Sequence, residues 1–193
     1  MPVPALRRII VAISGASGAV YGVRLLQALR EAQGVETHLV VSDAGWRNVG
    51  QEQGLERAAI ESLAHRVHDI HDVGAAIASG SFQCSGMVVA PCSMRTLAAI
   101  AHGLSDNLMT RAADVVLKER LRLVLLVRES PLSLIHLRNM VSVTEAGAIV
   151  CPPVPAFYLR PQSVEDIVDF SVARALDLLD VPHTLAARWE GQQ

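Results

Sequence analysis

The sequence predicts an α/β fold in three layers: one parallel sheet with helices on both faces. Short, continuous apolar runs, typical of strands buried on both faces, alternate along the chain with segments whose apolar residues have helical spacing. Of the 193 residues, 51% are hydrophobic and 19% are charged, which argues against disorder. We expect a single domain over residues 1–193, because a chain of this length has little room for two full cores.

The apolar pattern assigns each element in order. The first strand is an apolar run that stops at Ser14, and the helix after it carries Val20, Val23 and Leu26 on one face. Segment 65–82 is polar and contains Gly and Ser, so we expect it to be mostly loop. The expected strands are 9–13, 36–41, 86–90, 123–127 and 148–150, and the expected helices are 18–30, 43–64 (broken near Gly50 and Gly54), 94–101, 107–121, 132–146 and 164–179.

Polar residues follow the predicted strands. In parallel α/β sheets, ligands bind beyond the carboxyl ends of the strands. Hydroxyl, arginine, glutamate and tyrosine side chains should therefore gather at one edge of this sheet, and their convergence is stronger evidence of a site than any single motif. The segments concerned are Ser14–Gly18, Ser42–Asp43, Ser93–Thr96, Arg128–Glu129 and the proline-rich stretch 151–158.

Two of these segments fit a phosphate group. The loop 15–18 precedes a helix whose free amides could bind phosphate, although a plain strand-to-helix turn explains it equally well. Ser93, Arg95 and Thr96 also open a helix; they fit a phosphate monoester, and Ser93 can serve as a helix cap at the same time. A dinucleotide site ranks lower, because the G-x-G-x-x-G pattern is missing, although Asp43 ends the second strand where a ribose-binding acid would stand.

Arg128 and Glu129 directly follow the most apolar strand. A charged pair held at the ligand edge with restricted access of solvent suits proton transfer by the carboxylate. Arg111, Asp114 and Lys118 differ, because they are i,i+3 and i,i+4 partners on one helix, an arrangement that needs no function.

Composition excludes several classes of function. With 17 basic and 19 acidic residues, the chain has no basic excess for nucleic acid, and no apolar run approaches the length of a membrane span. Three scattered cysteines indicate a reducing, cytoplasmic location rather than a disulfide framework. We expect no metal: a solvated polar stretch is the favoured interpretation of the cluster His65, His68, His71, Asp69 and Asp72.

Five motifs together resemble the flavin prenyltransferases, which serve ubiquinone synthesis and aromatic-acid decarboxylation. They are SGASGAVYGVRLL, PCSMRTLAAIA, RAADVVLKER, RESPLSLIHLRNM and PPVPAFYLRPQSVEDIVDF. The resemblance runs from Ile9 to about Arg188, in order and with matching spacing. It implies a flavodoxin-like or Rossmann-like domain that binds FMN and assembles as a homododecamer built from trimers.

The resemblance also implies the residues of the site. The catalytic set comprises Glu129 as the acid–base carboxylate, Ser17, and Glu52 supplied across a subunit boundary. Contacts to dimethylallyl phosphate fall on Lys118, Tyr158 and Arg174. Contacts to FMN fall on Gly15, Ala16, Ser17, Ser42, Ser93, Met94, Arg95, Thr96 and Arg128, with Arg111 as a further arginine of the site.

Two positions depart from the family pattern. Asp43 stands where relatives commonly carry Lys, which leaves the charge near the flavin open. Val73 stands where some relatives have a Trp over the prenyl group, which implies an aliphatic wall for the isoprenoid.

The activity implied by the resemblance is transfer of a dimethylallyl group to N5 and C6 of reduced FMN. The product, prenylated FMN, would pass to a partner decarboxylase, and no metal is needed because the chain has no Asp-rich diphosphate motif. Two alternatives stay open: an FMN-dependent aromatic-acid decarboxylase that acts alone, and a non-catalytic flavin carrier. Whether the donor is a monophosphate or a diphosphate is also open.

Overall fold

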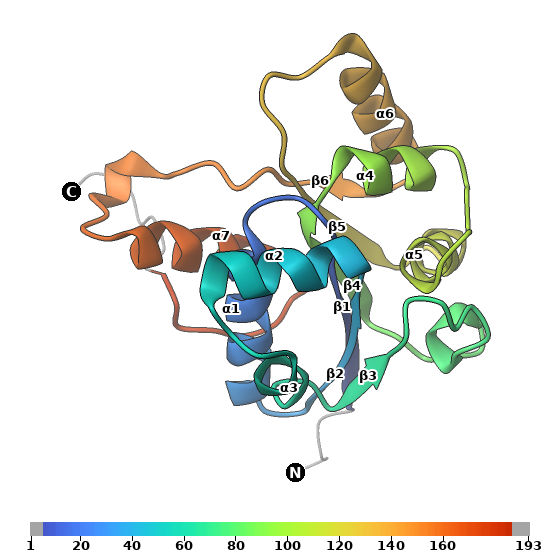
Figure 1. Cartoon of the computed structure of the whole chain (residues 1–193), viewed down its shortest axis with the longest axis horizontal. Coiled ribbons are helices and arrows are strands. Elements are labelled where there is room, and N and C mark those ends of the chain that lie inside the picture. Colours follow the sequence, from blue (N-terminus) through green and yellow to red (C-terminus); the bar gives the residue numbers. More distant parts are fainter. Residues whose placement is uncertain (1–5, 187–193) are drawn as a thin grey trace.

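The computed structural model describes residues 6–186, and its centre is one six-stranded sheet (Figure 1). All neighbouring strands pair in parallel, in the order β3-β2-β1-β4-β5-β6. This is the Rossmann order, which reverses direction between β1 and β4. The strands are β1 (Arg7–Ile13), β2 (Val35–Val41), β3 (Arg66–His68), β4 (Gly86–Cys92), β5 (Arg122–Val127) and β6 (Ile149–Val150).

Helices cover both faces of the sheet, which confirms the predicted fold class (Figure 1). Side chains alternate along a strand, so Ile9, Val11 and Ile13 of β1 enter one core and Ile10 and Ala12 enter the other. The first core is shared with α1 (Ala19–Glu31), α2 (Asp43–Gln53), α3 (Arg57–Glu61) and α7 (Val164–Leu178). The second is shared with α4 (Met94–Ala101), α5 (Leu108–Lys118), α6 (Leu134–Glu145) and the 3₁₀ turn η1 (Ala76–Ala78); a second such turn, η2, spans Phe157–Leu159.

Segment 65–82 is mostly loop, as predicted, but it also contains two short elements that the sequence did not indicate. They are the edge strand β3 and the turn η1. β3 lies at the edge of the sheet and pairs only with β2. It has three residues, which are too few to show a periodic pattern in the sequence. The predicted break between residues 43 and 64 falls at Gly54, which adopts a left-handed φ of 61° and ends α2, whereas Gly50 lies inside that helix.

Among residues 6–186, no helix is long and apolar enough to cross a membrane.

Candidate functional site

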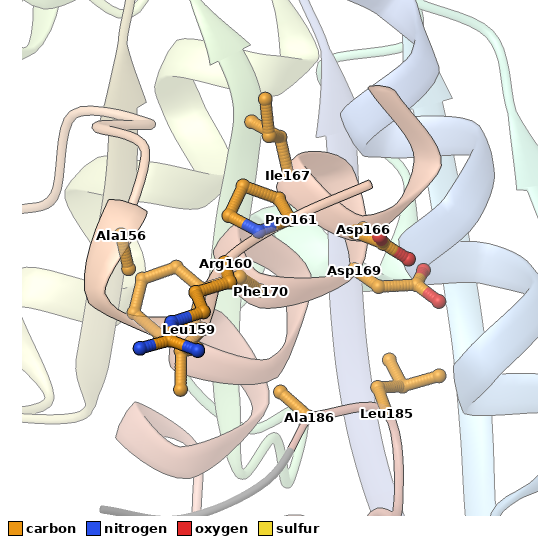
Figure 2. A pocket seen from close by; sticks show the side chains of 10 residues that line it. All are labelled: Ala156, Leu159, Arg160, Pro161, Asp166, Ile167, Asp169, Phe170, Leu185 and Ala186. Atoms are coloured by element: carbon orange, nitrogen blue, oxygen red, sulfur yellow. The ribbon is translucent and has the colours of Figure 1, made fainter. Parts of the chain in front are cut away.

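A small cavity lies between residues 156–161 and α7, and we assign it a structural rather than a functional role (Figure 2). It has a volume of about 190 Å³, and its two carboxylates already have partners within the chain. Asp169 pairs with Arg24 of α1 at 2.6 Å, and Asp166 accepts hydrogen bonds from the amides of Gln162 and Ser163. None of the residues predicted for the site lines this cavity.

A larger cavity, of about 620 Å³, lies at the carboxyl edge of the sheet near the point where the strand order reverses. Its size is within the usual range for small-molecule sites, and its position is the one where parallel sheets bind ligands. Five predicted flavin contacts line it together: Gly15, Ser42, Ser93, Arg95 and Thr96.

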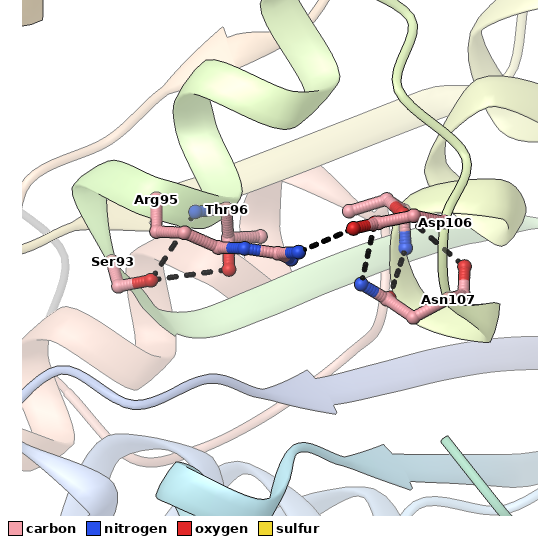
Figure 3. A network of polar contacts seen from close by, with 6 residues as sticks. Ser93, Arg95, Thr96, Asp106 and Asn107 are labelled. Carbon is pink, nitrogen blue, oxygen red and sulfur yellow. Dashed lines mark hydrogen bonds and ion pairs between the residues drawn. The ribbon is translucent and has the colours of Figure 1, made fainter. Parts of the chain in front are cut away.

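Two helices begin at this cavity, each with a serine cap. The hydroxyl of Ser42 accepts a hydrogen bond from the amide of Gly45 at the start of α2, and that of Ser93 accepts one from the amide of Thr96 at the start of α4. The Ser93 hydroxyl also donates to the Thr96 hydroxyl at 3.1 Å (Figure 3). Because helix N-termini carry partial positive charge and unpaired amides, the cavity favours an anionic ligand.

Arg95 is fixed above the first turn of α4 by a polar network (Figure 3). Its guanidinium contacts Asp106 at 2.6 Å, and the other oxygen of that carboxylate accepts a hydrogen bond from Asn107. Asn107 in turn caps α5 by accepting the amide of Thr110. The first turn of α4 has no acidic residue, so a cation and free amides face the cavity there.

Ser14 joins the two strands on either side of the reversal. Its buried hydroxyl donates to the carbonyl of Pro91 at 2.7 Å and accepts the amide of Ser93 at 2.8 Å. From the sequence, Ser14 marks only the end of a strand, because the tertiary contact that gives it a role leaves no local signal.

The loop after β1 approaches α2 closely. At Gly15, a Cβ would lie 2.4 Å from the Cβ of Ala44, so only glycine fits there. The carbonyl of Ala16 accepts a hydrogen bond from Asn48, and Ser17 is exposed beside it. This packing holds the loop against α2 and leaves Gly15 at the cavity wall.

The N-terminus of α1 is capped by an acidic side chain of the same chain. Oε2 of Glu52, near the end of α2, accepts hydrogen bonds from the amides of Gly18 and Ala19, both at 2.9 Å. The amides that could bind a phosphate after the first strand are thus partly used by Glu52. Sequence spacing alone does not bring these segments together.

Arg128 and Glu129 follow β5 at the same edge. The backbone amide of Arg128 donates a hydrogen bond to the carbonyl of Cys92. Burial raises the pKa of Tyr21, and the positive charge of the Arg128 guanidinium opposes this shift to a smaller extent. The expected restriction of solvent around Glu129 is wrong for a single chain: residues 128–135 are all exposed, and the Glu129 carboxylate accepts the amide of Ser130.

The residues predicted to bind dimethylallyl phosphate do not gather at the cavity of one chain. Lys118 ends α5, which runs back from the carboxyl edge towards the start of β5, and it pairs with Glu119. Arg174 pairs with Asp177. Tyr158 is 59% exposed and packs edge-on against Phe170.

Five of the predicted flavin contacts lie outside the cavity lining: Ala16, Ser17, Met94, Arg111 and Arg128. Arg111 pairs with Asp114, its i,i+3 neighbour on α5, as the sequence spacing indicated. Met94 is half-buried and packs against the core on the α4 side of the sheet.

The three histidines of segment 65–82 each contact a different residue. His65 contacts Thr37 at 3.0 Å, His68 contacts His38 at 2.9 Å between ring nitrogens, and His71 faces Asp43 at 3.7 Å. His65, Asp69, His71 and Asp72 are exposed, as expected for a solvated polar stretch, whereas His68 is partly buried and stacks on His38. In the part of the chain that the structure covers, no group of three His, Cys, Asp or Glu side chains could hold a metal ion.

The fold and the cavity define a class: a Rossmann-order α/β protein with an anion-favouring site at the reversal of the sheet. The model of the Flavoprotein family matches residues 5–176. A flavin prenyltransferase UbiX of Neisseria meningitidis is 58% identical over 186 residues, covering 96% of this chain and 98% of the relative, and the one from Escherichia coli is 53% identical over 188 residues, covering 96% and 100%. The chain belongs to the flavin prenyltransferases, a group of transferases within the Flavoprotein family.

Comparison with solved structures supports the same family. The chain is similar to AnUbiX in complex with FMN and dimethylallyl pyrophosphate, with a TM-score of 0.94 and 52% identity over 97% of this chain and 99% of that one. It is also similar to a dodecameric FMN-dependent UbiX-like decarboxylase from Escherichia coli, with a TM-score of 0.93 and 49% identity over 95% and 100% of the two chains.

Proposed function

We propose that this protein transfers a dimethylallyl group from dimethylallyl phosphate to reduced FMN. The observation that carries the proposal is the cavity at the carboxyl edge, where two capped helix N-termini, hydroxyls and Arg95 meet in a chain closely related to flavin prenyltransferases. The complex of AnUbiX with FMN and dimethylallyl pyrophosphate supports FMN and a dimethylallyl donor; the monophosphate form of that donor is part of the proposal. In the proposed reaction the prenyl group becomes bonded to N5 and C6 of the flavin, and phosphate leaves.

The residues present fit FMN. The hydroxyls of Ser42, Ser93 and Thr96 can hydrogen-bond its polar groups, and Arg95 with the first amides of α4 suits a phosphate monoester. Gly15 leaves room at the wall. When bound, reduced FMN supplies the nucleophile; the protein supplies binding, orientation and exclusion of water.

We assign the donor phosphate to Lys118, Arg174 and Tyr158 acting from more than one copy of the chain. Their separation from the cavity within one chain favours this arrangement, and the dodecameric relative supports a homododecamer. The surface also offers apolar side chains suited to subunit contacts. Those on α6 and around η2 include Leu134, Ile135, Val141, Val154 and Phe157, each more than half exposed.

Glu129 is the proposed carboxylate for proton transfer, because loss of a proton must accompany bonding at C6. Its exposure in one chain is consistent with a site completed by a neighbour, which would remove it from water. We propose that the product serves a separate decarboxylase. The cysteines at positions 84, 92 and 151 are free, and we propose a cytoplasmic location.

One assay tests this function against its rivals. Pure protein is mixed with reduced FMN and dimethylallyl phosphate without oxygen, and the flavin is analysed by mass spectrometry. A flavin heavier by one C5 unit is expected. Release of CO₂ from an aromatic acid without a partner would instead support a decarboxylase, an activity named for one of the structural relatives. Bound but unchanged flavin would leave only a carrier.

A further inference from the structure

We infer that Arg47 binds the phosphate of the flavin ligand and makes this site select FMN over riboflavin. The inference rests on the proposed function in one respect: FMN must occupy the cavity at the carboxyl edge. It goes beyond that function because neither sequence motifs nor family resemblance identified Arg47.

Arg47 lies on α2, one turn after Asp43, and both line the cavity. They share a face because residues four apart on a helix lie above one another. Arg47 thus lines the cavity from α2, whereas Arg95 and Thr96 line it from the first turn of α4.

The guanidinium of Arg47 has no hydrogen bond or ion pair within residues 6–186. The other arginine of the cavity, Arg95, is already held by Asp106 at 2.6 Å. Arginine offers a planar fork of donors that matches phosphate oxygens in pairs. The whole fork of Arg47 is therefore available to a ligand, whereas part of the Arg95 guanidinium is engaged by Asp106.

The net charge of the side chains around the cavity also favours a role for Arg47 in phosphate binding. Its charged side chains are two arginines, Arg47 and Arg95, and two aspartates, Asp43 and Asp106; His71, 3.7 Å from Asp43, adds charge only when protonated. With His71 neutral, two positive and two negative charges sum to zero. Without Arg47 the sum is −1, which would oppose a phosphate that carries about −1.5 to −2. The net charge of these side chains therefore repels the phosphate only when Arg47 is absent.

Equilibrium titration of the full-length protein with FMN and with riboflavin tests the inference. Arg47→Gln should weaken FMN binding about tenfold, the loss expected for one charge-assisted contact, and leave riboflavin binding within about twofold. Arg47→Lys, which keeps the charge but not the fork, should fall between. Asp43→Asn removes a negative charge next to the site and should tighten FMN binding but not riboflavin binding.

The matched control is Arg66→Gln, an equal change of charge at an exposed position on β3 outside this cavity, which should alter neither affinity. Thermal unfolding checks that each variant is folded. Unchanged FMN affinity in Arg47→Gln, or equal weakening of FMN and riboflavin, would overturn the inference, as would a wild-type protein that does not prefer FMN. Because no turnover is measured, a protein that selects FMN through Arg47 but makes no prenylated product would refute the proposed function alone.

Discussion

The carboxylate of Glu52 accepts the backbone amide of Gly18 at 2.9 Å, so the end of α2 caps the start of α1 within one chain. The same oxygen also accepts the amide of Ala19. Family resemblance implies a different role for Glu52, in a neighbouring subunit. The two roles make different predictions, because one concerns the stability of a single chain and the other concerns the completed assembly.

Replacing Glu52 by Gln should destabilise the fold slightly. The amide keeps an acceptor for Gly18 but loses the negative charge that the N-terminus of α1 favours, which at an exposed position is worth about 0.3–1 kcal/mol. Urea unfolding measures the difference. Glu31→Gln, which removes the same charge at an exposed position at the end of α1, where the helix dipole does not favour it, is the control. Equal midpoints for both variants would mean that the cap contributes nothing.

Subunit exchange should reveal whether sites are shared between copies. Lys118 lies away from the cavity of its own chain, whereas Glu129 lies at the carboxyl edge. Lys118→Met and Glu129→Gln proteins should each be inactive, and mixing them under conditions of exchange should restore part of the prenyl transfer. If exchange is verified by mass spectrometry and activity stays absent, Lys118 does not act from a neighbouring chain.

Glu129→Gln should separate binding from chemistry. The amide keeps the shape and hydrogen-bonding capacity of the side chain but cannot take up a proton, so we expect FMN to bind normally while turnover falls about 10²–10⁴-fold. Flavin titration and anaerobic turnover measure the two effects. Near wild-type turnover would make Glu129 structural and leave proton transfer to another group, such as the released phosphate.

Stability should fall in mild acid because of His38 and His68. Burial lowers the pKa of both imidazoles below the usual 6.5; for His38, repulsion by His68 and Arg8 adds to this effect and Glu36 opposes it. The folded state therefore favours the neutral rings. Their contribution is complete above pH 6.5 and is lost as the pH falls through the lowered pKa values.

Thermal unfolding at several pH values measures this effect. His68→Phe keeps an aromatic ring next to His38 but removes one titrating group, so stability should decline less steeply below pH 6.5. His102→Phe, at an exposed position on the end of α4, is the control. An unchanged slope in His68→Phe would show that other groups cause the acid sensitivity.

The sequence predicted the part of the site that depends on strand ends. Ser42, Ser93, Arg95 and Thr96 follow buried strands directly, and parallel topology brings them to one cavity without further information. Arg47 was missed because it lies a full turn into its helix, where an arginine ordinarily faces solvent. Lys118 shows the limit of local patterns: only the reversed course of α5 reveals its distance from the cavity.

The Ser14 hydroxyl has a mechanical consequence. It holds the carbonyl of Pro91 and the amide of Ser93 at once, in a buried position between β1 and α4. The halves of the sheet cannot swing apart there without breaking two buried hydrogen bonds, which is costly because the freed groups cannot reach water. A hinge in the sheet at this point would therefore be costly, and we expect ligands to reach the cavity past the loops of the carboxyl edge without an opening of the sheet.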